Sequence, residues 1–368
     1  MRGARRAGWF LDKNMQYNNN STGRRRINRE EAIALFKNKS LLELGKIADD
    51  IRKKKHPDNV VTFIIDRNIN YTNVCTSECK FCAFYKKYGV SDTGAYVLSK
   101  EQIFAKIDET KKLSGTQILL QGGLNPDISI DYYLELLSDI KEKFDIHIHA
   151  FSPPEIIFIA DSNGITVKET IGLLKEAGLG SVPGGGAEIL VDRVRKKISP
   201  NKINSRRWLE VMEEVHLAGL NSSATMMFGT IETDEDIIEH LFKLRELQDR
   251  TGGFRAFIPW SFQSKHTALN PRGVYGHYYL KVLAVSRIIL DNFDNIQASW
   301  VTQGAKMGQA ALSFGANDMG STMLEENVVK AAGTANSAVD EKLMVRLIKD
   351  AGFIPVQRIN NYDRIKFY

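Results

Sequence analysis

The stretch Asn73-Val-Cys-Thr-Ser-Glu-Cys-Lys-Phe-Cys-Ala-Phe-Tyr85 holds Cys75, Cys79 and Cys82, the only three cysteines among 368 residues. A chain that uses cysteine so sparingly, and gathers all of it in one loop, uses the thiols for one shared task. The spacing Cys-x3-Cys-x2-Cys supplies three thiolates, one fewer than the four protein ligands of a structural zinc site. Three thiolates on a 4Fe–4S cluster leave one iron free to bind a small molecule.

Other uses of these cysteines fit the sequence less well. A disulfide leaves one thiol over, and nothing suggests a secreted protein. A zinc site needs a fourth ligand, and the nearest downstream histidine is His147. Unrelated buried cysteines are common in proteins, but they do not normally cluster in this way. The spacing therefore favours an iron–sulfur cluster.

Length and composition are those of an ordinary globular protein, long enough for one large α/β barrel or two smaller domains. No apolar run is long enough to span a membrane. No apolar segment typical of a secretory signal is present. Thiols that serve as metal ligands favour a reducing compartment. We therefore expect a cytoplasmic protein without a membrane segment.

The formal net charge of +6 comes entirely from the N-terminus, where residues 1–30 hold eight basic and two acidic residues. The remaining chain is neutral and lacks the basic stripe of a nucleic-acid-binding face. We expect residues 1–26 to be a disordered basic tail, and we expect no nucleic-acid partner.

Hydrophobic periodicity divides the rest into three parts. Residues 27–60 hold two helical patterns, the first with Asn28 and Glu31 as a capping box, and we expect them to cap one end of the main domain. Residues 61–335 alternate strand and helix patterns, which predicts parallel β/α units. Residues 336–368 are expected to form a helix and a short strand or tail that close the barrel. The eight expected strands are Thr62–Asn70, Gln117–Gln121, Ile146–Phe151, Gly180–Val182, Ser223–Phe228, Phe254–Pro259, Ile296–Val301 and Ala316–Met319.

Eight such units predict a closed (β/α)8 barrel, in which chemistry sits at the carboxyl ends of the strands. Gln121, Gly122 and Gly123 follow the second strand, and the glycines allow another group to approach the backbone closely. Glu188 ends the loop Pro183-Gly-Gly-Gly-Ala-Glu188, which lacks the Gly-Lys-Ser/Thr ending of a phosphate loop. Its carboxylate could bind ribose hydroxyls or an amine, or simply begin a helix.

Further candidates follow other strands. His147 and His149 alternate along the third strand and so point to one side. They are candidate proton acceptors, or core histidines. Trp260, Phe262 and Gln263 could line a pocket for an aromatic substrate or pack in the core. The remaining polar candidates are Ser152, Glu155 and Gln303 after strands, and Asp318, Glu325 and Glu326 near the last strand. Glu325 and Glu326 could equally be helix-start charges.

The cysteine loop resembles that of the radical S-adenosylmethionine (SAM) superfamily. Asn70-Tyr-Thr-Asn-Val-Cys75 and Cys79-Lys-Phe-Cys-Ala-Phe-Tyr85 are similar to the branch that acts in futalosine-dependent menaquinone synthesis and in deazaflavin synthesis. The resemblance runs from about residue 28 to the end. Its other motifs are Gly122-Gly-Leu-Asn-Pro126, His149-Ala-Phe-Ser-Pro-Pro-Glu-Ile156, Pro183-Gly-Gly-Gly-Ala-Glu-Ile-Leu190, Ala224-Thr-Met-Met-Phe-Gly229, Phe257-Ile-Pro-Trp-Ser-Phe-Gln263, Ala298-Ser-Trp-Val-Thr-Gln-Gly304 and Gly315-Ala-Asn-Asp-Met-Gly-Ser-Thr-Met-Leu-Glu-Glu-Asn327.

This resemblance implies a TIM-type barrel and a radical SAM oxidoreductase. The three cysteines would hold a 4Fe–4S cluster, and the amino and carboxylate groups of SAM would chelate its open iron. Reduction of bound SAM would yield a 5′-deoxyadenosyl radical, with an electron donor such as flavodoxin or ferredoxin. The residues expected to contact the cofactor are Phe81, Gln121, Gly122, Gly123 and Glu188.

Within the branch, the strings Phe-Ser-Pro-Pro-Glu and Trp-Ser-Phe-Gln are most similar to those of the enzymes that cyclise dehypoxanthine futalosine. In them the radical takes hydrogen from the ribose C4′, the carbon radical adds to the benzoate ring, and loss of a proton and an electron restores aromaticity. The candidates for the base are His147, His149, Glu155 and Asp318, which the sequence does not separate. The candidate substrate contacts are Ser152, Trp260, Phe262, Gln263, Gln303 and Glu325.

Three alternatives stay open at this point. Two are sister enzymes, an aminofutalosine synthase and the synthase of the deazaflavin pathway. The third belongs to another class, a non-catalytic iron–sulfur electron carrier. Ligation by three cysteines, which leaves one iron open, and a barrel mouth rich in polar residues disfavour the electron carrier.

Overall fold

The computed structural model describes residues 26–269, 273–334 and 338–368. The expected basic tail, residues 1–26, lies outside the described residues except for Arg26. The Arg26 guanidinium pairs with Asp291 at 2.5 Å and with Asp249 at 2.6 Å. The chain is therefore tied to the folded part from its first described residue.

The first strand of the barrel is split in two. β1 (Val60–Ile64) pairs in parallel with β11 (Asp318–Ser321) and with β12 (Ile354–Arg358), whereas β2 (Asp66–Asn70) pairs in parallel with β5 (Gln117–Gln121). The expectation of one uninterrupted strand over Thr62–Asn70 is therefore wrong. The break at Ile65 lets the chain exchange β12 for β5 as its neighbour.

The barrel strands form a closed ring. A seven-stranded parallel sheet runs in the order β10-β9-β8-β7-β6-β5-β2. A parallel bridge from Gln297 to Asp318 carries it on to β11, which pairs with β1 and so returns to β2. The remaining members are β6 (His147–Ala150), β7 (Ser181–Val182), β8 (Asn221–Phe228), β9 (Phe254–Ser261) and β10 (Asn295–Ile296). The predicted eight-unit parallel barrel is confirmed.

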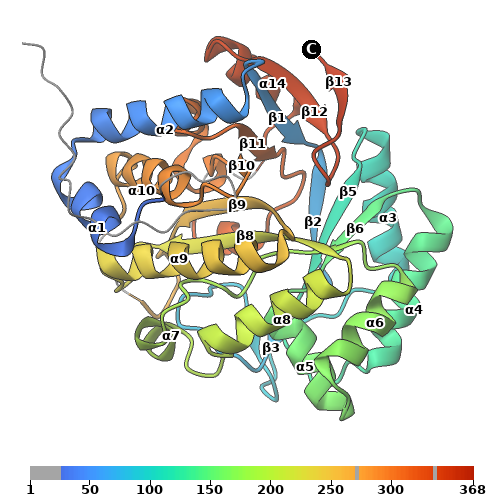
Figure 1. Ribbon diagram of the computed structural model, residues 1–368. Helices are drawn as coiled ribbons and strands as arrows, with labels where there is room; N and C mark the ends of the chain where they lie inside the picture. The colour runs from blue at the N-terminus through green and yellow to red at the C-terminus, as the bar shows by residue number, and fades with distance from the viewer. Residues whose placement is uncertain (1–25, 270–272, 335–337) are drawn as a thin grey trace, which may run out of the picture.

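Helices lie outside the strands (Figure 1). Several begin where the sequence places a capping box, as at Ser99 with Gln102 and Thr166 with Glu169, because the cap satisfies free backbone N–H groups. Their bounds are α3 (Lys100–Lys112), α4 (Ile130–Lys143), α5 (Pro153–Asn163), α6 (Val167–Ala177), α7 (Asp192–Ile198), α8 (Ser205–Leu217), α9 (Asp234–Thr251), α10 (Gly276–Ile289), α11 (Trp300–Gln303), α12 (Ala305–Leu312) and α13 (Val328–Ala331).

Two helices precede the barrel. α1 (Arg29–Asn38) begins at the expected Asn28–Glu31 capping box and packs against α9. α2 (Leu41–Lys55) lies along α10. Figure 1 shows these two helices side by side. Phe36 and Leu44 are fully buried in these contacts. The two helices thus join the outer helical layer at one flank of the barrel.

The C-terminal segment lies at the end of the barrel opposite the cysteine loop. α14 (Glu341–Asp350) leads into β12, and β13 (Arg364–Phe367) pairs with β12 in antiparallel fashion. In Figure 1 these strands lie beside β1 at the top, far from β3 (Val74–Cys75) at the bottom. The turn between β12 and β13 brings Asn360 and Tyr362 to the barrel interior. β1 and the C-terminal strands thus form the base of the barrel.

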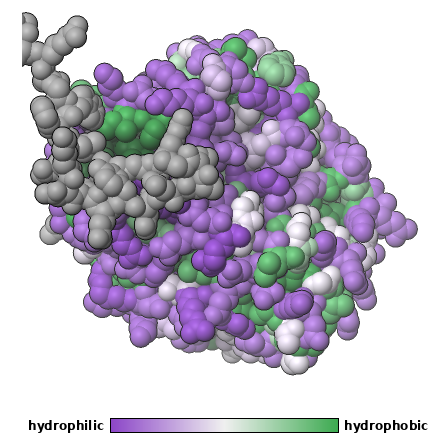
Figure 2. Space-filling view, viewed as in Figure 1, coloured by the Kyte–Doolittle hydropathy of each residue, from purple (hydrophilic) through white to green (hydrophobic). Residues whose placement is uncertain are grey.

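Among the described residues no helix is long and apolar enough to cross a membrane. The face shown in Figure 2 is mostly hydrophilic, with hydrophobic side chains in separate small groups. The apolar side chains instead fill the space between the strands and the helices, where Trp208, Phe257 and Phe293 are fully buried.

Candidate active site

The cysteine loop is held by backbone hydrogen bonds to distant parts of the barrel. β3 pairs with β4 (Lys86–Lys87) to form a small ribbon of its own. Outside that ribbon, Thr76 N–H donates to the Leu124 carbonyl at 3.0 Å, and Lys80 N–H donates to the Ile198 carbonyl at 2.9 Å. The loop is therefore fixed against both the loop after β5 and the end of α7.

The three thiols are free, and their surroundings fit a cluster. Cys79 is buried, whereas Cys75 and Cys82 are half-buried. Backbone N–H groups already point at sulfur, since Ser77 N–H lies 3.4 Å from Cys75 Sγ and donates to it. Burial raises the pKa of the Cys79 thiol to about 12. A thiolate there therefore requires the positive charge of bound iron.

Two further observations bear on the kind of metal group. Ser77 Oγ is buried without a hydrogen-bond partner among the described residues, so a bound group would find a free polar atom in this loop. Nowhere in the described chain do three or more histidine, cysteine or acidic side chains converge closely enough to hold one metal ion. A cluster needs no such convergence, because its three thiolates each bind a different iron. The donor set fits a 4Fe–4S cluster.

Gly122 and Gly123 lie directly against this loop. Gly123 N–H donates to the Thr72 carbonyl at 3.0 Å. A Cβ atom at Gly123 would lie 2.1 Å from the Val74 carbonyl oxygen and 2.9 Å from Cys75 Cβ. Only glycine fits at such a distance. The structure therefore brings the predicted Gly–Gly pair to the cysteine loop.

Glu155 positions this Gly–Gly loop. Its Oε1 accepts the Gly122 N–H at 2.9 Å and the Tyr71 hydroxyl at 2.8 Å, and its Oε2 accepts the Ser152 N–H at 2.7 Å and hydroxyl at 2.6 Å. Burial raises the pKa of Glu155, and these donors oppose that effect. The carboxylate is fully occupied and does not line the main cavity. We therefore do not place Glu155 among the bases, nor Ser152 among the substrate contacts.

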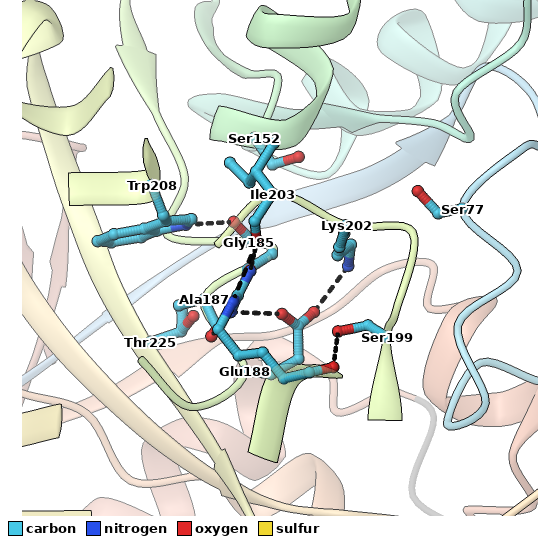
Figure 3. Close-up of polar contacts among 12 residues, drawn as sticks. Ser77, Ser152, Gly185, Ala187, Glu188, Ser199, Lys202, Ile203, Trp208 and Thr225 are labelled. Atoms are coloured by element: carbon cyan, nitrogen blue, oxygen red, sulfur yellow. Dashed lines mark hydrogen bonds and ion pairs between the residues drawn. The ribbon is translucent and has the colours of Figure 1, made fainter. Parts of the chain in front are cut away.

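Glu188 lines the cavity, and its carboxylate is paired with the Lys202 ammonium (Figure 3). Lys202 Nζ lies 2.7 Å from Glu188 Oε1, and Arg195 Nη1 lies 3.4 Å from Glu188 Oε2. Arg195 also donates to the Gly186 carbonyl at 3.1 Å and so shapes the loop. Glu188 itself has a φ of +40°, a left-handed conformation that an ordinary residue adopts only under constraint. The loop thus holds this carboxylate in a fixed place.

Lys202 extends this charge pair to the cysteine loop. Its ammonium lies 5.1 Å from the centre of the Phe81 ring. The pKa of Lys202 is raised: burial opposes the charge, but the Cys79 thiolate and Glu188 favour it. Phe81 is therefore part of the contact between the two loops, and a positive charge stands beside Cys79.

The main cavity occupies the barrel interior, with a volume of about 320 Å³. Its lining includes Gln121, Glu188 and Trp260 from the carboxyl ends of the strands. It reaches down to Asp66 and Tyr362 at the base. This volume lies within the usual range of small-molecule sites.

A small crevice of about 50 Å³ connects the cysteine loop with the barrel mouth. Phe81, Cys82, Trp260, Phe262 and Gln263 line it, and Trp260 also lines the main cavity. Aromatic side chains thus stand between the thiols and the cavity. This arrangement suits a planar group near the cluster.

His147 and His149 share one hydroxyl partner. His147 Nε2 lies 2.7 Å and His149 Nδ1 lies 2.6 Å from Ser181 Oγ. Of the two, His149 lines the cavity. Burial lowers the pKa of His147 to about 4 and that of His149 to about 3. Both imidazoles are therefore neutral at neutral pH.

Asp318 is bound in an ion pair that leaves it no free oxygen. Arg358 donates to it at 2.5 and 3.1 Å, Thr62 at 2.5 Å and the Gly320 N–H at 2.6 Å. Asp318 is fully buried and does not line the cavity. We therefore assign Asp318 a structural role at the base of the barrel rather than a catalytic one. This structural role depends on Arg358, which the C-terminal strand β12 brings to it.

Three other candidates lie outside the main cavity. Glu325 pairs with Lys106 at 2.8 Å and lines a separate outer pocket. Its neighbour Glu326 turns inward and accepts from Asn68 Nδ2 at 3.0 Å. Gln303 donates to Ser261 Oγ, behind the cavity wall. Neither Glu325 nor Gln303 is positioned as an expected substrate contact.

Sequence reasoning missed several residues of the site. Lys202, Ser181 and Arg358 carry no motif, because their partners are close only in the folded chain. Asp66, by contrast, begins the run Asp66-Arg-Asn-Ile-Asn70, whose polar residues alternate. That alternation predicts one polar face of a strand, and Asp66 does line the cavity.

A parallel barrel with three free thiols at its mouth, a Gly–Gly loop against them and a cavity of small-molecule size below defines a radical SAM enzyme. Residues 69–244 match the model of the radical SAM superfamily, and residues 251–367 match the model of the CofH/MqnC C-terminal region. The chain belongs to the radical SAM superfamily, in the branch that this C-terminal region defines. Its cofactors are a 4Fe–4S cluster and SAM.

Within that branch, two relatives are each named cyclic dehypoxanthine futalosine synthase. The protein of Halalkalibacterium halodurans is 44% identical over 93% of this chain and 92% of its own length. That of Streptomyces coelicolor is 42% identical over 92% of this chain and 86% of its own length. The 5-amino-6-(D-ribitylamino)uracil–L-tyrosine 4-hydroxyphenyl transferase of Methanocaldococcus jannaschii is 42% identical over 91% and 96%.

Solved structures share the fold at much lower identity. Methylornithine synthase superposes with a TM-score of 0.71 at 18% identity, covering 90% of this chain and 94% of that chain. The FeFe-hydrogenase maturase from Carboxydothermus hydrogenoformans gives 0.72 at 18% identity, over 92% and 78%. These neighbours show the barrel architecture alone.

Proposed function

We propose that this protein converts dehypoxanthine futalosine to cyclic dehypoxanthine futalosine in menaquinone biosynthesis. The observation that carries the proposal is the match over nearly the whole chain to two synthases of that name, 44% and 42% identical. The site supports it, because three free thiols stand beside a cavity of small-molecule size.

Bound SAM and the reduced cluster supply a 5′-deoxyadenosyl radical when both are present. Cys75, Cys79 and Cys82 would hold the cluster, and the Gly122–Gly123 backbone beside them would contact SAM. Glu188, held by Lys202 at 2.7 Å, is in place to accept hydrogen bonds from SAM. These residues fix the cofactor at the barrel mouth.

The protein's part in the substrate chemistry is to orient an aromatic ring and remove a proton. Trp260 lines both the cavity and the crevice beside the thiols, and the benzoate ring would lie against it in the cavity. Phe262 and Gln263 line the crevice alone. His149 lines the cavity and is neutral, because burial lowers its pKa to about 3. It is therefore available to take the proton whose loss restores aromaticity.

An anaerobic assay tests this function. The cluster-loaded protein is mixed with a reductant, SAM and synthetic dehypoxanthine futalosine, and products are followed by mass spectrometry. We expect 5′-deoxyadenosine together with a product two hydrogens lighter than the substrate. Cleavage of SAM without that product would contradict the proposed substrate, and the absence of any SAM cleavage would contradict the enzyme class.

The second candidate is the 4-hydroxyphenyl transferase reaction, because the archaeal relative of that name is 42% identical over 91% of this chain. A parallel reaction with tyrosine and 5-amino-6-(D-ribitylamino)uracil separates the two. Product in that mixture alone would replace the cyclase with the transferase.

We further propose a cytoplasmic enzyme that receives electrons from a small carrier such as flavodoxin or ferredoxin. Three free thiols that bind a cluster suit a reducing compartment. Substituting purified flavodoxin or ferredoxin, each with its reductase, for the chemical reductant checks the donor. Turnover with dithionite but none with either carrier would reject it.

A further inference from the structure

Two imidazoles and one hydroxyl form an unbroken chain of hydrogen bonds along β6, from the cavity toward the amino end of the strand. His149 Nδ1 lies 2.6 Å from Ser181 Oγ, which lies 2.7 Å from His147 Nε2. β6 and β7 set this geometry, because His149 stands opposite Ser181 in their parallel register. Gly180 leaves room for the His147 ring, since a Cβ atom at Gly180 would lie 2.6 Å from His147 Cε1.

The two ends of this chain lie in different surroundings. His149 is 9% exposed and lines the cavity. His147 is the first residue of β6 and is half-buried, at the amino end of the barrel strands. With Nδ1 of His149 bonded to Ser181, its Nε2 is left for the cavity. With Nε2 of His147 bonded to the same hydroxyl, its Nδ1 is the ring nitrogen left to release a proton.

We propose that His149, Ser181 and His147 form a proton relay that carries the proton released from the substrate to solvent at the base of the barrel. This inference rests on the proposed function and deepens it, because it gives the proton of rearomatisation a route. It also makes Ser181 a functional residue and His147 the exit of the route rather than a second base.

The transfers balance. The C–H bond at the newly substituted ring carbon breaks, and its proton goes to His149 Nε2. The bond's electron pair stays in the ring, and the ring's one surplus electron would go to a one-electron acceptor, which an oxidised iron–sulfur cluster would supply. The Nδ1 proton of His149 moves to Ser181 Oγ, and the hydroxyl proton of Ser181 moves to His147 Nε2. His147 then releases its Nδ1 proton to water, so one proton enters the chain and one leaves it.

The chemistry of the three groups suits this task. A serine hydroxyl has one proton and two lone pairs, so it accepts from one imidazole while it donates to the other. Burial keeps both histidines neutral, and the positive charge of Arg358 also lowers the pKa of His149. A neutral imidazole of low pKa passes a proton on readily and does not retain it.

The chain offers a matched control in His216. Its Nδ1 lies 2.7 Å from Thr251 Oγ1 and its Nε2 lies 2.7 Å from Ser222 Oγ, and burial lowers its pKa to about 4. His216 thus resembles His147 in hydrogen bonding and burial, but it lies on α8 and does not line the cavity. A purely structural effect of losing a bridging histidine will appear in both His147→Gln and His216→Gln.

The test compares Ser181→Ala, His147→Ala, His147→Gln and His216→Gln with the wild type, all cluster-loaded. We expect Ser181→Ala to lower formation of the cyclic product 10- to 100-fold, while 5′-deoxyadenosine continues to form and becomes uncoupled from product. Rates in H2O–D2O mixtures should show several protons in flight in the wild type and fewer in Ser181→Ala. Added imidazole should restore His147→Ala, and His216→Gln should resemble the wild type.

The outcomes separate the relay from the function. If Ser181→Ala forms the cyclic product at the wild-type rate and with the wild-type isotope profile, the relay is overturned and the proposed cyclase activity is not. The substrate-free protein gives an independent measure, since exchange of the His147 and His149 ring protons with water should be coupled and should lose that coupling in Ser181→Ala. Coupled exchange with no cyclic product from the wild type overturns the proposed function alone. Uncoupled exchange in the wild type overturns the relay.

Discussion

The backbone N–H of Gly122 donates a hydrogen bond to Glu155 Oε1 over 2.9 Å. This bond ties the loop after β5, which faces the cysteine loop, to the first turn of α5. The same oxygen accepts the Tyr71 hydroxyl at 2.8 Å. One buried carboxylate therefore fixes the backbone that we expect to face SAM, although it touches neither the cavity nor the thiols.

Replacing this carboxylate should weaken both the fold and SAM binding. Glu155→Gln puts an amide NH2 group where Glu155 now accepts hydrogen bonds, so at least one buried donor loses its partner. We expect a loss of about 2 kcal/mol in the free energy of unfolding, measured by urea denaturation. SAM affinity, measured anaerobically by calorimetry, should fall as well.

Glu169→Gln is the matched control, because Glu169 makes the same capping box with Thr166 on an exposed part of α6. It should cost no more than about 1 kcal/mol and leave SAM affinity unchanged. Equal losses of stability and of affinity in the two variants would show that Glu155 is only a helix cap.

Lys202 should matter for both the Glu188 pair and the cluster. Lys202→Met leaves the buried Glu188 carboxylate with Arg195 alone, at 3.4 Å. We expect a cost of about 3 kcal/mol, because a buried charge loses its partner. The midpoint potential of the cluster, followed by an EPR redox titration, should become more negative, because a positive charge beside Cys79 is gone.

Two companions sharpen this test. Lys202→Arg keeps the charge and should keep the potential. Lys100→Met removes an ammonium from a more exposed pair with Glu135 and Asp139 and should cost less than about 1 kcal/mol. An unchanged potential in Lys202→Met would disprove the electrostatic role of Lys202 toward the cluster.

The sequence predicted those features of the fold and site that depend on residues close together in the chain, and it missed those that depend on residues far apart. The cysteine loop is local, and so are the strand and helix patterns that predict the barrel. Glu155 was also readable, since Ser152-Pro-Pro-Glu155 has the spacing of a capping box, but its place after a strand suggested catalysis instead. The carboxylate of Asp318 was misjudged because its partner Arg358 lies 40 residues further on. No local sequence pattern predicts an ion pair between residues so far apart.

That pair gives a prediction for the base of the barrel. Arg358→Met leaves the fully buried Asp318 carboxylate without its cation, and we expect a loss of about 3 to 5 kcal/mol on urea unfolding. Asp318→Asn should cost a similar amount. The double variant should be more stable than the sum of the two losses predicts, by about 2 kcal/mol, because it leaves no unpaired charge. Strict additivity would mean that the two residues act independently.

Buried neutral histidines should make the protein sensitive to mild acid. Burial lowers the pKa of His240 to about 3, and those of His147, His149 and His216 are lowered as well. Since an unfolded histidine titrates near pH 6.5, the unfolded chain takes up protons first as the pH falls. This stability is therefore fully present above about pH 6.5 and is lost as the pH falls toward 3, by up to about 1.4 kcal/mol per pH unit for each histidine.

His240 is the clearest place to measure this effect. It is fully buried, and its Nδ1 accepts the Leu190 N–H at 2.9 Å, a bond that a glutamine oxygen can replace. His240→Gln should lower the free energy of unfolding at pH 7.5, yet flatten its decline between pH 6 and 5 by about 1 kcal/mol per pH unit. His277→Gln, at an exposed position on α10, should change neither value. A decline of unchanged slope in His240→Gln would mean that His240 takes up its proton equally in the folded and unfolded chains.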